Sequence, residues 1–311
     1  MIRRIKISLF SKIHVLSHGR NQSIHSLYQI MNTKRNLSLN LAAAIAVSLF
    51  FLAGCGGAGD QKANEEAADS INKELSLSPE AVNLLYKMPT PFEVTMLLEE
   101  AKAGYIFDIT NPVENVGKYM TEKSKAINLG VYSADLAYSA TYNHIDNTNQ
   151  FLGCTGKLAD DLGIAGIYHP NLVEKVKSYD NNKDSLVNLV SGIFLATNDF
   201  LSKNNRNQVG VYIATGAFVE GLYLASSLNI VAENNRDITA IIYKQLYNYD
   251  QLMSILDLYQ NDTAMKSLYD EMLKLKPAFT DFGLAPGTKL DPQQINGIND
   301  VIAGVRNALI Q

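Results

Sequence analysis

Three carboxylate residues stand inside long apolar stretches of the sequence. They are Asp135 in VYSADLAYSATY, Asp199 in GIFLATNDFL and Glu220 in GAFVEGLYLA. A carboxylate that is buried must be paired with a cation, hydrogen-bonded or bound to a metal. These residues are therefore the first candidates for chemistry in the chain.

Tyrosine hydroxyl groups accompany two of these carboxylates. Helical spacing places Tyr138 and Tyr142 on the same face as Asp135, so their side chains are neighbours. If the helices that carry Asp135 and Glu220 pack together, the two carboxylates approach one polar spot. One interpretation is a small cation or polyhydroxyl ligand, bound by Asp135, Glu220, Tyr132, Tyr138, Tyr212 and Tyr223. The other is a Tyr–Asp network that fixes the register of the helices.

Sequence motifs of known catalytic sites are missing. The chain has no Gly-x-Ser-x-Gly, no phosphate-binding loop and no His-Glu-x-x-His, and it lacks the Glu-x-x-His pairs of di-iron bundles. A chain without Trp also lacks the usual stacking platform of a glycoside hydrolase. We therefore predict no catalytic residue, no metal ligand and no cofactor, and an enzyme ranks third among the functions considered.

Only two cysteines occur, Cys55 and Cys154. Two cysteines cannot form a disulfide scaffold or a zinc site of the multi-cysteine type. Cys154 is expected to be a small buried apolar side chain. Cys55 has a different setting, at the end of an apolar segment near the N-terminus.

The sequence before Cys55 has three parts in order. Lys34 and Arg35 form a short basic region, residues 41–51 form an apolar region, and Leu52-Ala53-Gly54-Cys55 follows. The apolar region is too short for a comfortable membrane span, which needs about 20 residues. The arrangement resembles the type II signal peptide and lipobox of bacterial lipoproteins. The resemblance covers residues 31–55 and implies that 31–54 are removed and that Cys55 is lipidated.

The flanking segments complete the predicted organisation. Residues 1–30 indicate an upstream mis-called start or a long basic region before the signal. Residues 55–78 are small, polar and acidic, which is typical of a flexible tether. Gly56, rather than Asp, follows Cys55; by analogy with lipoproteins of Gram-negative bacteria, this favours the outer membrane, facing the periplasm or the cell surface. Residues 79–311 form the folded domain.

Charge is distributed unevenly along the chain. The first 54 residues hold seven of the 27 basic residues and none of the 31 acidic ones, so the remainder carries 20 basic and 31 acidic residues. Polyanion binding needs a basic stripe, and none is present. The charge pattern argues against nucleic acid as a partner.

The domain is expected to be all-α, because helical spacing and helix-start signals recur and no stretch alternates as a strand does. Helices are predicted to start near Pro79, Pro91 and Pro112, with further segments near 114–144, 148–162, 170–179, 183–203, 207–229, 235–260, 262–276 and 292–309.

An internal similarity predicts that the bundle has two related helical halves. Residues 130–138 align with residues 210–218 at an offset of 80, with five of nine positions identical. Both segments carry stripes of small residues, which let two helices approach closely: Gly130, Ala134, Ala137 and Thr141 in one, and Gly210, Ala214, Ala217, Gly221 and Ala225 in the other. We expect these helices to contact each other at the centre of the bundle.

These features together predict a lipid-anchored envelope protein of a Gram-negative bacterium. Its leading function is non-enzymatic binding or scaffolding, with the membrane contacted through lipidated Cys55 and an envelope protein as a possible partner. The alternative is a small-molecule or metal-binding protein that uses the buried carboxylates and tyrosines. An exposed apolar patch would favour a protein partner.

Overall fold

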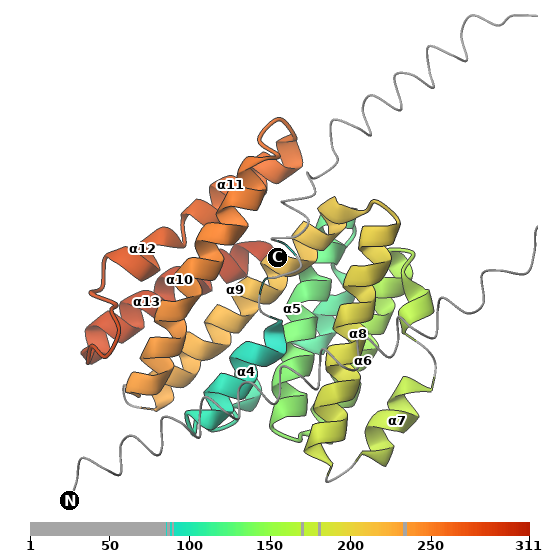
Figure 1. The fold of residues 1–311 in the computed structure, drawn as a ribbon, viewed down its shortest axis with the longest axis horizontal. Helices are drawn as coiled ribbons and strands as arrows, with labels where there is room; N and C mark the ends of the chain where they lie inside the picture. The colour runs from blue at the N-terminus through green and yellow to red at the C-terminus, as the bar shows by residue number, and fades with distance from the viewer. Residues whose placement is uncertain (1–84, 86–87, 89, 169–170, 180–181, 233–234) are drawn as a thin grey trace, which may run out of the picture. The chain divides into compact units, whose positions relative to one another are not determined.

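Every regular element in the described part of the chain is a helix (Figure 1). The computed structural model describes residues 85, 88, 90–168, 171–179, 182–232 and 235–311, all within the unit Gln61–Gln311. No strand occurs among these residues, so the predicted all-α, multi-helix fold is confirmed. The predicted signal peptide, Cys55 and the tether lie outside the described residues.

The helices follow one another with short connections. In chain order they are α4 (Pro91–Glu100), η1 (Phe107–Ile109), η2 (Val113–Gly117), α5 (Glu122–Thr141), α6 (Ile145–Asp161), η3 (Ala165–Ile167), α7 (Leu172–Ser178), α8 (Lys183–Lys203), α9 (Asn207–Val231), α10 (Arg236–Asp257), α11 (Thr263–Leu273), α12 (Lys276–Thr280) and α13 (Pro292–Leu309).

Local sequence explains where several helices begin. Thr121 caps α5 by accepting a hydrogen bond from the Ser124 amide, and the Ser124 side chain bonds back to the Thr121 backbone. Asp291 and Gln294 make the same reciprocal pair at α13, where Pro292 occupies the first helical position. Such caps satisfy backbone N–H groups that have no partner inside the helix.

Helices α5 and α9 pack against each other at the centre of the fold, as predicted. Most of their residues are buried, and their backbones approach closely at two glycines. A Cβ atom on Gly130 would collide with the carbonyl oxygen of Ile213, and one on Gly216 would collide with that of Ile127. The absence of a side chain at Gly130 and Gly216 is therefore what allows this distance between the helices.

The stripe of small residues on α9 serves two contacts, since the Ala217 backbone lies against Gly130 of α5 while several stripe residues line a pocket. Gly210, Ala214, Ala217 and Gly221 line a small apolar pocket of about 30 Å³ beside the start of α4. The α9 glycine that meets α5 is Gly216, which lies outside that stripe. The 80-residue repeat stays a prediction, because the helix contacts do not test it.

The remaining helices form layers on the two sides of this central pair (Figure 1). Helices α4, α6 and α8 pack against α5, while α10 and α13 pack against α9. By length and composition α9 is apolar enough to span a membrane, but 83% of its apolar window is buried within the protein. A core helix has the same properties, so α9 is weak support for a membrane span.

Several predicted boundaries were wrong, most clearly on either side of α5. The predicted segment 114–144 is a short 3₁₀ turn, η2, followed by α5 from Glu122 to Thr141. No α-helix begins at Pro112, which precedes η2. The predicted segment 262–276 ends earlier, since α11 stops at Leu273 and α12 follows separately.

Candidate functional site

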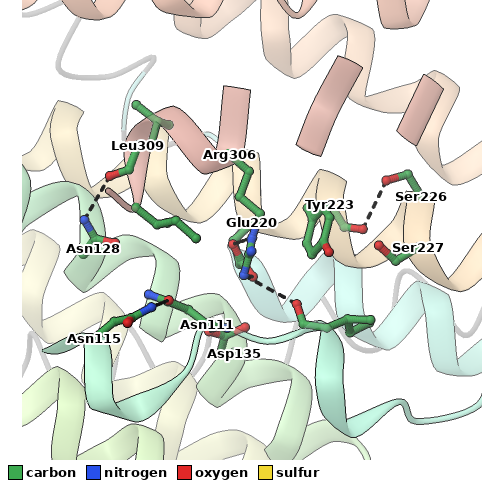
Figure 2. Close-up of polar contacts among 12 residues, drawn as sticks. Asn111, Asn115, Asn128, Asp135, Glu220, Tyr223, Ser226, Ser227, Arg306 and Leu309 are labelled. Atoms are coloured by element: carbon green, nitrogen blue, oxygen red, sulfur yellow. Dashed lines mark hydrogen bonds and ion pairs between the residues drawn. The ribbon is translucent and has the colours of Figure 1, made fainter. Parts of the chain in front are cut away.

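Asp135 and Glu220 lie in the core of the bundle on the two central helices. Asp135 is on α5, Glu220 is on α9, and neither side chain is exposed to solvent. The apolar residues around them bury both helices in the interior, so the two carboxylates are buried as well. Figure 2 shows both residues among the polar side chains at this level of the core.

Arg306 on α13 is the ionic partner of Glu220. Its Nε donates to Glu220 Oε2 at 2.6 Å and its Nη2 donates to Oε1 at 2.8 Å, so the ion pair is bidentate. The same guanidinium lies 4.2 Å from the centroid of the Tyr223 ring, in cation–π geometry. Burial lowers the pKa of Arg306, but the adjacent Glu220 carboxylate outweighs burial and raises it. Arg306 is therefore a permanent cation.

Asp135 has a different environment from Glu220. Its Oδ2 accepts a hydrogen bond from the Asn111 backbone N–H at 3.1 Å. Burial, followed by the nearby Glu220 carboxylate, raises the pKa of Asp135 well above its usual range, against the opposing effect of Arg306. This shift favours the protonated, neutral form of Asp135 in the folded protein. Its Oδ1 is buried and has no hydrogen-bond partner among the described residues.

The tyrosines of α5 bind the backbone of the segment that connects α4 to α5. The Tyr132 hydroxyl donates to the Pro112 carbonyl at 2.7 Å, and the Tyr138 hydroxyl accepts from the Ile106 amide at 2.8 Å. Burial is the main reason why the pKa values of both tyrosines rise. Both hydroxyls therefore stay protonated and act as neutral hydrogen-bonding groups.

Helix α13 is also tied to the two central helices by uncharged side chains (Figure 2). Ser226 Oγ on α9 donates to Asn299 Oδ1 at 2.8 Å. Asn128 Nδ2 on α5 donates to the Leu309 carbonyl at 3.1 Å. These bonds hold Arg306 in register with Glu220.

The structure thus brings together only part of the predicted site. Asp135, Glu220 and Tyr223 meet around Arg306, whereas Tyr132 and Tyr138 face the α4–α5 connection. Tyr212 lies eight residues before Glu220 on α9, which corresponds to about 12 Å along a helix. Its hydroxyl accepts from Gln208 at 3.4 Å, and burial raises its pKa to about 12. The ligand-binding role of these residues stays a prediction.

Asp199 is not buried, although an apolar stretch surrounds it in the sequence. Its side chain is 62% exposed and forms an ion pair with Lys203 one helical turn later. Helix α8 has one buried face, and Asp199 lies on the other. Cys154 agrees with its prediction, since it is a free thiol, is buried, and has a pKa that burial raises to about 11.

Sequence reasoning missed two residues of the core network, Arg306 and Asn111. Arg306 follows Val305 and lies one turn after Ile302, so it borders the apolar stripe of the last helix. A cation at the border of an apolar stripe, in a chain that also has a carboxylate inside an apolar helix, could have predicted the ion pair between Arg306 and Glu220. Asn111 acts through its backbone amide, which no local pattern reveals.

Surface clefts of the described residues lie away from Asp135 and Glu220. One lies beside Lys289 and Asp291, one at the α5–α6 turn, and one beside Lys123 and the end of α13. Within the described ranges, no group of three or more His, Cys, Asp or Glu side chains gathers in a way that could hold a metal ion.

Comparison with known proteins gives no relative for this chain. A scan against protein-family models finds no match, and searches of curated proteins and of solved structures find none either. Its function must therefore be inferred from its own residues.

Proposed function

We propose that this chain is a lipid-anchored envelope protein of a Gram-negative bacterium whose helical domain acts in binding or scaffolding rather than catalysis. The observation that carries the anchor is the order of residues before Cys55: a basic pair, an apolar segment of eleven residues and Leu52-Ala53-Gly54-Cys55. Gly56 after the cysteine favours the outer membrane. A single acyl chain binds a membrane weakly, whereas several chains on one cysteine anchor a protein firmly.

The contacts of the core support a structural role for its polar residues. Glu220 forms an ion pair with Arg306, and Asp135 accepts a hydrogen bond from the Asn111 backbone amide. The tyrosine hydroxyls of α5 bind backbone groups of the α4–α5 connection. A ligand that used Asp135 and Glu220 would have to displace contacts that the protein itself supplies. This favours binding at the outer surface over the alternative of a buried small-molecule or metal site.

The anchor is tested by labelling growing cells with an alkyne analogue of palmitate, followed by capture of the full chain. We expect label on the wild-type protein and none on Cys55→Ala, because Cys55 supplies the only thiol in the lipobox. Cys154→Ala is the matched control, since it removes the other cysteine, which is buried. Label that survives in Cys55→Ala, or that is lost in Cys154→Ala, would overturn the proposed anchor.

The location is tested on the same three proteins by separating membranes on a density gradient. The wild-type chain and Cys154→Ala should sediment with the outer membrane, and Cys55→Ala should move to the soluble fraction. Sedimentation of the wild-type chain with the inner membrane would contradict the outer-membrane assignment while leaving lipidation intact.

A further inference from the structure

An open cleft lies where α5 turns into α6. It encloses about 680 Å³ and is lined by residues of η1, the turn, the first part of α6 and α7. The lining residues are Phe107, Asn143, His144, Ile145, Asp146, Asn147, Asn149 and Lys177. A cleft with an aromatic surface and a few polar groups is the usual form of a small-molecule site.

Phe107 presents an exposed aromatic ring to this cleft. Its side chain is 57% exposed, although burying a large apolar side chain away from water is favourable. Tyr105 and His144 pack against the ring edge-to-face, with centroids 4.9 Å and 5.0 Å away. Tyr105 in turn stacks between His144 and Tyr138, at 3.9 Å and 4.5 Å. Phe107 is therefore held in a fixed orientation while it remains open to a ligand.

Three asparagine side chains line the same cleft. Asn147 Nδ2 donates to the Tyr105 hydroxyl at 3.0 Å. The side-chain oxygens of Asn143 and Asn149 are buried but accept no hydrogen bond from the described residues. Buried amide oxygens normally have a donor. The terminal torsion of asparagine is soft, so either amide can rotate to meet a hydroxyl group in the cleft.

The charges of the cleft cancel. Asp146 carries one negative charge and Lys177 one positive charge, and both line the opening. A site for a phosphate or another anion needs an excess of cations, and a site for a metal ion needs several carboxylates. The amides offer both donors and acceptors, which match hydroxyl groups. This combination suits a neutral ligand with many hydroxyl groups.

We propose that this cleft binds a neutral pyranose unit of a glycan. The C–H face of the sugar ring stacks on Phe107, because hydrogens with partial positive charge are attracted to the negative face of an aromatic ring. The sugar hydroxyls bind the amides of Asn143, Asn147 and Asn149. The proposal goes beyond the lipid-anchored function, since binding in the cleft requires no anchor.

The test is calorimetric titration of the full chain, in a detergent whose headgroup is not a sugar, with neutral tetrasaccharides. The probes are the N-acetylglucosamine tetramer, maltotetraose and cellotetraose. We expect saturable binding of at least one probe, and a rise of about tenfold or more in its Kd for Phe107→Ala. Tyr247→Ala is the matched control, since Tyr247 is an exposed aromatic residue, 69% accessible, on α10. Its Kd should equal that of the wild-type protein.

A second variant guards against a general folding defect. Asn143 has a positive φ of 58°, so Asn143→Gly removes the amide while keeping a residue that adopts this conformation readily. It should weaken binding while the thermal unfolding curve keeps its single transition. Absence of binding for all three probes, or equal Kd values for Phe107→Ala and Tyr247→Ala, would overturn the sugar site. Cys55→Ala should bind as the wild-type protein does, so failure of the anchor and failure of the sugar site are distinguishable.

Discussion

Glu220 and Asp135 are both fully buried carboxylates, yet they differ in their partners. Glu220 has a cationic partner, Arg306, that donates hydrogen bonds to both of its oxygens. Asp135 has an amide partner, and burial and Glu220 raise its pKa, which favours its neutral form. Glu220 and Arg306 carry opposite charges, which compensate each other in this part of the core.

Substitution of each carboxylate by its amide should separate these two states. We expect Glu220→Gln to lower the free energy of unfolding by about 3–5 kcal/mol, because the guanidinium of Arg306 stays buried without its counter-ion. Asp135→Asn should cost less than ~1.5 kcal/mol, since a neutral amide replaces a neutral carboxyl group of similar shape. Urea unfolding measures both.

The outcome also bears on the ligand-binding alternative. A structural network predicts a large loss of stability in Glu220→Gln. A ligand site predicts that Glu220→Gln keeps its stability and loses a bound molecule, which native mass spectrometry of the full chain would detect. Equal and small losses of stability in both variants would argue against the structural interpretation.

Among the elements, the connection between α4 and α5 depends most on residues far away in the sequence. Asn111 is fully buried although it lies in a loop, and its amide needs a partner. Asp135 supplies that partner from 24 residues away. Tyr132 and Tyr138 do the same for Pro112 and Ile106. The three polar side chains of α5 thus replace the hydrogen bonds that a helix would have supplied.

This dependence explains what could be predicted from the sequence and what could not. Asp291 with Pro292 marked the start of α13 correctly, because a cap is a local pattern. The region near Pro112 was wrongly predicted to start an α-helix. Its stabilising contacts come from α5, far away in the sequence, so no local pattern reveals them. Asp135 and Glu220 were correctly chosen as buried from the apolar residues around them. Asp199 had similar neighbours but lies on the exposed face of α8.

The contact between α5 and α9 makes a prediction about Gly130. Gly130→Ala should destabilise the protein by about 1–3 kcal/mol, because its new methyl group meets the backbone of α9 rather than a flexible side chain. Gly153→Ala on α6 is the control, since nothing lies within 4 Å of a Cβ there. The control should gain up to about 1 kcal/mol from its higher helix propensity. Thermal unfolding distinguishes the two; a stabilised Gly130→Ala would contradict the close approach of the helices.

For the whole molecule, the raised pKa of Asp135 makes stability depend on pH. The pKa of Asp135 is raised in the folded protein, whereas an unfolded aspartate titrates near pH 3.9. Below that pH both states are protonated, so the stabilisation from the raised pKa is fully present. As pH rises toward the folded pKa, the unfolded state releases its proton first, and the stabilisation is lost.

We therefore expect the wild-type protein to lose stability relative to Asp135→Asn as pH rises above about 4. Urea unfolding of both proteins between about pH 4 and pH 8 measures this difference, and the comparison cancels the contribution of every other titrating group. A difference that stays constant with pH, or that grows in favour of the wild-type protein, would show that Asp135 is ionised in the folded state.

The distance in sequence between Glu220 and Arg306 has a consequence for how the chain folds during synthesis. The partners are 86 residues apart, and the cation belongs to the last helix. Helices α5 and α9 leave the ribosome well before α13, so their shared interior holds a carboxylate without its counter-ion until then. We therefore expect the central pair to reach its full stability only after α13 has packed against it. For the exported protein proposed above, that order is an advantage, because a chain that completes its core late stays unfolded long enough to cross a membrane.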